Sequence, residues 1–69
     1  MSTQKIFQML ELSKQVLSKV SFDRNLFYKE LKKSISWLKS EDVVILKIWC
    51  LSTFAIYKDL IIDAFEPMN

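Results

Sequence analysis

Cys50 carries the most reactive side chain in the sequence, because a thiol can act as a nucleophile or a redox group. Either role needs a lowered thiol pKa, which a histidine, a nearby cation or a helix N-terminus can provide. The chain contains no histidine, and Cys50 lies in the middle of an apolar helical segment. A buried cysteine behaves as a small apolar side chain. We therefore predict a structural role for Cys50, no catalytic residue and no enzymatic activity.

Three carboxylates near the end of the chain could also do chemistry. Asp59, Asp63 and Glu66 have the i, i+4, i+7 spacing that places them on one face of a helix. Paired carboxylates can bind a divalent cation or act as acid and base. Carboxylate metal sites in helical bundles draw their ligands from several facing helices, and the chain offers few other acids. We expect a solvated acidic stripe that could face lysines of another helix, with no metal ion and no cofactor.

Basic residues gather in the middle of the chain, where they could follow the phosphates of a nucleic acid. The residues concerned are Lys29, Lys32, Lys33 and Lys39. The next helix would then enter the DNA groove, and a recognition helix must present polar and basic side chains there. The polar stripe of that helix is acidic, so DNA would repel it. A small nucleic-acid-binding regulator is therefore the alternative to the main hypothesis below.

The length of 69 residues allows one domain, and the composition excludes several classes of site. One cysteine excludes an internal disulfide, the lack of histidine excludes Cys/His zinc sites, and the lack of glycine excludes phosphate-binding loops. With 51% hydrophobic and 26% charged residues, the chain is expected to fold. A core this small is usually marginal unless a disulfide, a metal or a partner subunit supports it.

The apolar periodicity predicts a single all-α domain over residues 1–69, a small bundle of three helices completed by self-association. The helices are expected at about 3–19, 24–39 and 41–65. The domain would have four helices if the last one breaks near Ser52.

Local signals mark where two of these helices begin. Asp23 is the expected N-cap of the second helix, because its carboxylate can accept hydrogen bonds from amides of the first turn. Phe22 and Phe27 have the spacing of a hydrophobic staple. Ser40 is the expected N-cap of the third helix.

The last helix differs from the other two, because apolar residues surround it almost completely. Its polar stripe is narrow and consists of Glu41, Ser52, Asp59, Asp63 and Glu66. A helix of this kind needs burial on nearly all sides, and two short helices can cover only part of it. The remainder would be an exposed apolar patch, which usually marks an interface.

We therefore predict a protein that self-associates through this helix, with a dimer favoured, or that binds another protein. The expected contact face is Leu46, Trp49, Thr53, Ile56 and Leu60. The other side, with Phe54, Ile61 and Phe65, is assigned to the core, although the two sides could be reversed.

The charges are distributed unevenly along the chain, whose net charge is +2. Residues 1–40 hold eight Lys and Arg against three acids, whereas residues 41–69 hold two against five. Such a dipole favours contact between the two halves, within one chain or between antiparallel chains.

No signal peptide is visible at the start of the sequence. The longest apolar stretch, residues 43–57, is too short and too interrupted to span a bilayer. We expect a cytoplasmic protein with a reduced thiol and no membrane span.

One sequence pattern covers roughly residues 16–54. It consists of Val20-Ser21-Phe22-Asp23, Leu26-Phe27, Lys29-Glu30-Leu31, Trp37-Leu38, Glu41, Leu46-Lys47 and Trp49. This pattern resembles a group of short all-helical bacterial proteins with no assigned activity. The resemblance implies a cytosolic bacterial protein and carries no functional site.

Overall fold

The computed structural model describes residues 2–66, with side chains from residue 9 onward. It contains the α-helices α1 (Ser2–Lys19), α2 (Arg24–Trp37), α3 (Ser40–Thr53) and α4 (Lys58–Phe65), with a 3₁₀ helix, η1 (Ala55–Tyr57), before α4. The described part of the chain has no strand, so the prediction of an all-α fold is confirmed.

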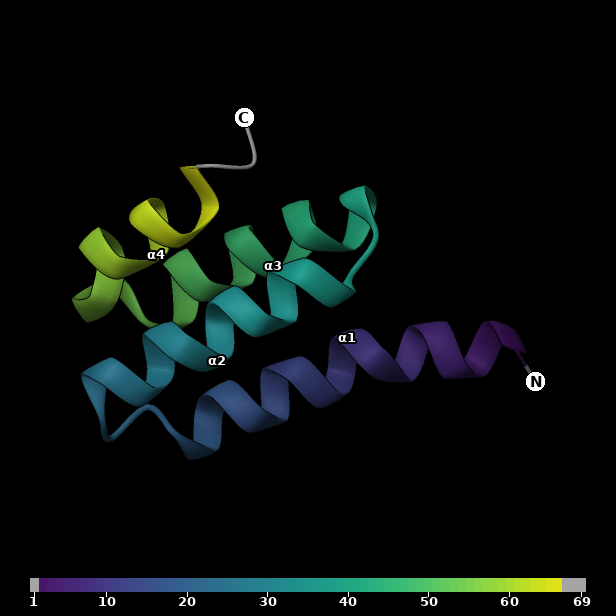
Figure 1. The fold of residues 1–69 in the computed structure, drawn as a ribbon, viewed down its shortest axis with the longest axis horizontal. Coiled ribbons are helices and arrows are strands. Elements are labelled where there is room, and N and C mark those ends of the chain that lie inside the picture. The colour runs from purple at the N-terminus through teal and green to yellow at the C-terminus, as the bar shows by residue number, and fades with distance from the viewer. Residues whose placement is uncertain (1, 67–69) are drawn as a thin grey trace.

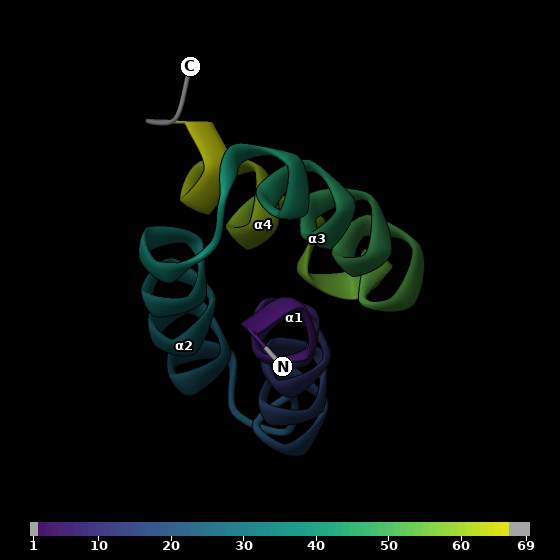
Figure 2. The same ribbon diagram turned by 90° about the vertical axis from the view of Figure 1, so that its right-hand side faces the viewer.

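The four α-helices surround one core. α1 and α2 form an antiparallel hairpin, and α3 and α4 lie together on one side of this hairpin (Figure 1). In the end view, α1 and α2 occupy the lower half and α3 and α4 the upper half (Figure 2). α2 packs against α1 and α4, and α3 packs against the same two helices. The chain therefore closes into a bundle with α3 diagonally across from α2.

The start of α2 follows the predicted cap. The Asp23 carboxylate accepts hydrogen bonds from the backbone amides of Asn25 (3.0 Å) and Leu26 (3.1 Å). α2 ends at Trp37, two residues before the predicted boundary, because the backbone becomes extended at Leu38.

The predicted cap of α3 is wrong. Ser40 is already the first helical residue, and Lys39 precedes it with extended backbone angles and no side-chain capping bond. The turn between α2 and α3 is therefore made by two extended residues, Leu38 and Lys39.

The expected last helix is divided, as in the four-helix alternative. α3 ends at Thr53, and the backbone of Phe54 leaves the helical region with φ −120° and ψ 54°. The Phe54 ring packs edge-on against Phe27 and Trp49, with centroid distances of 5.0 and 5.4 Å. Tyr57 packs against Phe27 at 4.9 Å. Aromatic contacts of this geometry are favourable, so they stabilise the break that returns α4 to α2.

The predicted staple between Phe22 and Phe27 is absent. Phe27 is fully buried, whereas Phe22 exposes 80% of its surface. Phe27 packs instead on Phe54 and Tyr57, which come from the far end of the chain.

Every α-helix contributes apolar side chains to the core. The buried residues are Leu10, Leu17, Phe27, Leu31, Ile35, Val43, Leu46, Cys50, Ile61, Ala64 and Phe65. No described polar side chain is buried among them. The candidate sites therefore lie on the surface.

Candidate interaction surfaces

Three branched apolar side chains of α3 point to solvent. Val44, Ile45 and Ile48 expose 56%, 47% and 62% of their surface. Ile48 follows Val44 by four residues and Ile45 by three, so its side chain lies next to both on the helix surface. Glu41 and Ser52 are also exposed and continue the same side toward the two ends of α3. We call these five residues the outer α3 face.

The opposite side of α3 is buried, so α3 is apolar on both sides, as the sequence predicts. Val43, Leu46 and Cys50 point into the core, and Leu46 has no exposed surface. The assignment of Leu46 to a contact face is therefore wrong, because this side chain supports the fold.

The other four residues of the predicted contact face do not share one environment. Trp49 and Leu60 are half-buried against the core, whereas Thr53 and Ile56 are exposed. The five residues share one face only if the helix continues past Ser52, and the break at Phe54 separates Ile56 and Leu60 from the three residues on α3.

Sequence reasoning missed the outer α3 face although a signal was present. Glu41 and Ser52 belong to the predicted polar stripe, which marks the solvent side of the helix. Ile45 and Ile48 lie between them on the same side. The residues that the sequence assigns to the core do lie there, since Ile61 and Phe65 are buried and Phe54 packs against the core.

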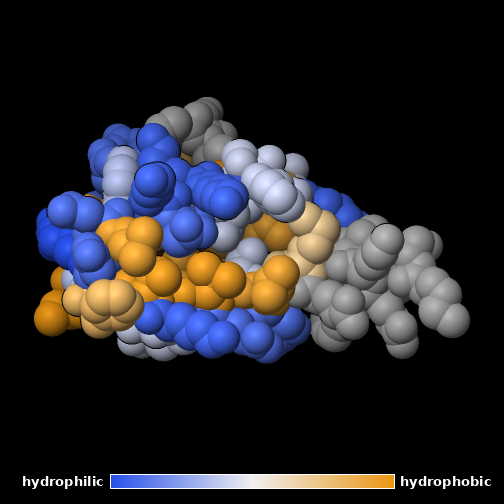
Figure 3. Space-filling model, turned by 60° about the horizontal axis from the view of Figure 1, so that its bottom comes forward, coloured by the Kyte–Doolittle hydropathy of each residue, from blue (hydrophilic) through white to orange (hydrophobic). Residues whose placement is uncertain are grey.

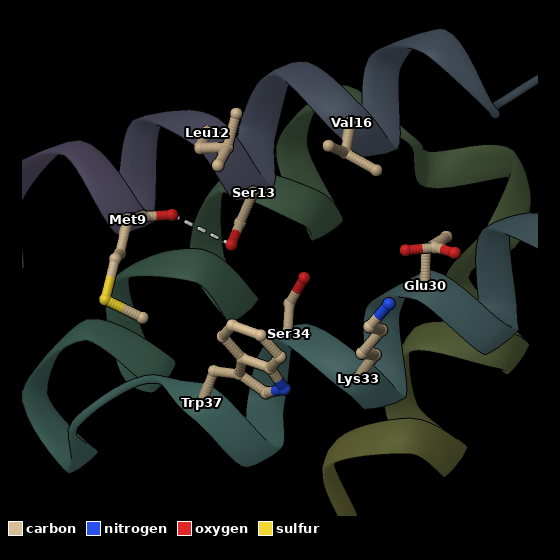
Figure 4. Close-up of a pocket in the computed structure, with 8 residues that line it drawn as sticks. All are labelled: Met9, Leu12, Ser13, Val16, Glu30, Lys33, Ser34 and Trp37. Carbon is tan, nitrogen blue, oxygen red and sulfur yellow. Dashed lines mark hydrogen bonds between the residues drawn. The ribbon is translucent and has the colours of Figure 1, made fainter.

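A second apolar surface is concave and lies between α1 and α2. The hollow has a volume of about 230 Å³ and is lined by Met9, Leu12, Ser13, Val16, Glu30, Lys33, Ser34 and Trp37. We call these eight residues the α1–α2 groove. Met9 and Trp37 lie at one end, and Glu30 and Lys33 at the other (Figure 4). From outside, an apolar strip runs between two hydrophilic bands (Figure 3).

The four lysines of the predicted nucleic-acid surface are all exposed. Lys29, Lys32 and Lys33 lie on one side of α2, and Lys39 lies in the turn before α3. The Lys32 ammonium is 5.5 Å from the centre of the Tyr28 ring. The salt bridges found among the described side chains involve none of these lysines.

Two residues of the predicted acidic stripe, Asp59 and Asp63, join α4 to α2, whereas Glu66 is exposed at the end of α4. Arg24 donates a 2.5 Å hydrogen bond to the Asp59 carboxylate, and this bond lowers the pKa of Asp59. The Tyr28 hydroxyl donates to the Asp63 carboxylate, which raises the pKa of Tyr28. The partners are thus an arginine and a tyrosine, whereas the sequence pointed to lysines. Both contacts are exposed to solvent.

Cys50 lies in the core with no exposed surface, as predicted. Burial raises the pKa of its thiol to about 12. The thiol is therefore protonated at neutral pH and is shielded from reagents in solution.

Two further findings concern the described residues only. No three side chains of the metal-ligating types lie close enough together to hold a metal ion. None of the helices combines the length and the apolar character that crossing a bilayer requires.

The chain matches no protein-family model, and no curated protein or solved structure is significantly similar to it. The resemblance to short bacterial helical proteins therefore stays a prediction.

Proposed function

We propose that this protein is a non-enzymatic interaction module that self-associates through the outer α3 face. The observation that carries the proposal is the exposure of Val44, Ile45 and Ile48 on the side of α3 opposite the core. Burial of apolar surface favours association by roughly 25 cal/mol per Å². A contiguous group of branched aliphatic side chains on a small domain is typical of an interface. The predicted cytoplasmic location belongs to this proposal.

Two features favour a second copy as the partner. The core of this small domain is supported by no disulfide, since Cys50 is the single cysteine. Association with a second copy would add the apolar burial that a small core lacks. The basic half and the acidic half of the sequence also make each copy electrostatically complementary to another.

The decisive experiment compares two isoleucines that are both exposed. We would measure solution mass by light scattering over a concentration series for the wild type, Ile48→Glu and Ile56→Glu. Ile56 exposes 83% of its surface but lies on η1, outside the outer α3 face. We expect the wild type to exceed the single-chain mass of 8.2 kDa and Ile48→Glu to return to it. Ile56→Glu should stay assembled.

The other outcomes are equally informative. If Ile56→Glu lowers the mass and Ile48→Glu does not, the contact lies on the surface predicted from the sequence. A wild type that stays at 8.2 kDa at every concentration overturns self-association. A different protein would then be the expected occupant of the outer α3 face.

The basic side of α2 supports nucleic-acid binding as a second candidate. The observation that favours this candidate is that Lys29, Lys32 and Lys33 are exposed together and form no salt bridge with a described side chain. Phosphate contacts weaken steeply with salt. We would titrate a labelled duplex at low and high salt with the wild type and with Lys29→Glu. Binding that high salt and the substitution both remove would favour this candidate, and no binding at low salt would exclude it.

A further inference from the structure

We infer that the outer α3 face of one copy docks into the α1–α2 groove of a second copy, so that the chains assemble head to tail. This inference rests on the proposed self-association and identifies the surface that receives α3. The contact belongs to the helix-in-groove type, in which an amphipathic helix lays its apolar side into a hydrophobic groove.

The shape of the outer α3 face requires a concave partner. Val44 and Ile45 are consecutive residues, and consecutive side chains on an α-helix point about 100° apart. Ile48 lies between these two directions, one turn further along. A flat surface can therefore cover Ile48 but only part of Val44 and Ile45. A groove can contact all three, because its two walls reach the two flanks of the helix.

The α1–α2 groove supplies such walls from two different helices. Leu12 on α1 and Trp37 on α2 expose 59% and 63% of their surface. Val16 extends the α1 wall, and the hollow of about 230 Å³ lies between the walls (Figure 4). This is room for a few aliphatic side chains. Tryptophan is among the residues enriched at binding hot spots, so Trp37 is the expected anchor of the contact, and Leu12 adds apolar surface on the facing wall.

The charges at the two surfaces indicate the direction of docking. Glu41 lies at the start of the outer α3 face, and Lys33 lies at one end of the groove. Lys29 lies one turn before Lys33 on α2 and adds a second positive charge to that end. Glu30 is the one acidic residue that lines the groove there, so two lysines stand against one carboxylate. Placing Glu41 beside Lys33 directs Ile48 toward the Trp37 end of the groove.

A contact between two outer α3 faces would lack this pairing. In a parallel arrangement Glu41 would meet Glu41 of the second copy, and in an antiparallel arrangement it would meet Ser52. Neither arrangement forms an ion pair along the face. Charge complementarity therefore favours the groove over a second outer α3 face.

A head-to-tail contact has a measurable consequence for the size of the assembly. Each added copy brings both a groove and an outer α3 face, so growth continues beyond two chains unless a ring closes. The inference thus departs from the dimer that the sequence favours. We expect the wild-type mass to rise past twice 8.2 kDa as concentration increases.

The test uses two single variants and their mixture. Leu12→Glu places a charge in the α1–α2 groove, and Ile48→Glu places a charge at the centre of the outer α3 face. Both positions are exposed, so the helical circular dichroism signal should be retained. If it is not, Leu12→Gln and Ile48→Gln replace them. We expect each variant alone to stay at 8.2 kDa and the equimolar mixture to reach twice that mass. In the mixture, one intact groove meets one intact face.

The contrary results separate this inference from the proposal beneath it. If Leu12→Glu assembles like the wild type while Ile48→Glu does not, the groove is not the partner surface, and self-association through α3 still stands. If the two variants do not combine in the mixture, the head-to-tail arrangement is overturned. If Ile48→Glu assembles like the wild type, both the proposed function and this inference are wrong.

Discussion

The Tyr57 hydroxyl donates a 2.6 Å hydrogen bond to the backbone carbonyl oxygen of Ser21, which lies 36 residues earlier in the sequence. The bond joins η1 to the turn between α1 and α2. The ring of Tyr57 also lies 4.9 Å from Phe27. One side chain thus connects the break after α3 to the beginning of α2.

Replacing Tyr57 by phenylalanine should therefore lower the free energy of unfolding by about 1 kcal/mol, since it removes one partly buried hydrogen bond and keeps the ring. Urea denaturation followed by circular dichroism would measure the change. Tyr28→Phe is the matched control, because it removes the exposed bond to Asp63. A larger loss in Tyr28→Phe than in Tyr57→Phe would contradict this ranking.

The cap of α2 gives a second prediction. Asp23→Ala removes the acceptor of two backbone amides and should cost about 1 kcal/mol of stability. Asp23→Asn should cost much less, because asparagine is an equally good N-cap. Equal losses in the two variants, measured by urea denaturation, would show that the charge of Asp23 matters more than its capping bonds.

Substitutions at two adjacent residues of α3 should affect different properties, because one side chain is buried and the other is exposed. Leu46→Ala removes a fully buried side chain and should lower stability by about 2–5 kcal/mol. Ile45→Ala acts at the surface and should leave monomer stability nearly unchanged while weakening assembly. The experiment therefore combines thermal unfolding at low concentration with light scattering at high concentration. A stable Leu46→Ala variant would mean that α3 is rotated about its axis from the orientation described above.

The Cys50 thiol should make the fold sensitive to alkaline pH. Its pKa is about 12 in the folded chain, against an ordinary value of 9.0. Below pH 9.0 the thiol is protonated in both states and adds no pH dependence. Above that pH the unfolded chain loses the proton and the folded chain keeps it, so stability falls as pH rises.

The comparison of wild type with Cys50→Ala isolates this effect, because it cancels every other effect of pH that the two proteins share. The difference in unfolding free energy between the two proteins should shrink as pH increases beyond 9.0. A difference that is constant across this range would refute the assignment of a shielded thiol.

Local patterns in the sequence were enough for the helices and for one cap. The periodicity of apolar residues gave α1 and α2 to within about two residues at each end, and Asp23 caps α2 as expected. The division after Thr53 could be anticipated only as an alternative. Its position depends on the contacts of Phe54 with Phe27, which is distant in sequence.

The surfaces were harder to predict than the helices. A helical wheel treats residues 41–65 as one cylinder and cannot show that Leu46 and Ile56 belong to separate elements. The α1–α2 groove was not predicted at all. On a helical wheel Leu12 and Trp37 lie on the flanks of their helices, and the groove exists because packing brings those flanks together.

The short α4 has a consequence for the order of folding. Its eight residues are too few to form a stable helix in isolation. Its buried residues Ile61, Ala64 and Phe65 belong to the shared core, and the Arg24–Asp59 and Tyr28–Asp63 contacts that join it to α2 each span 35 residues. α4 should therefore become ordered only after α2 is in place. In native-state hydrogen exchange, its amides should be the first of the bundle to exchange, well before those in the middle of α2.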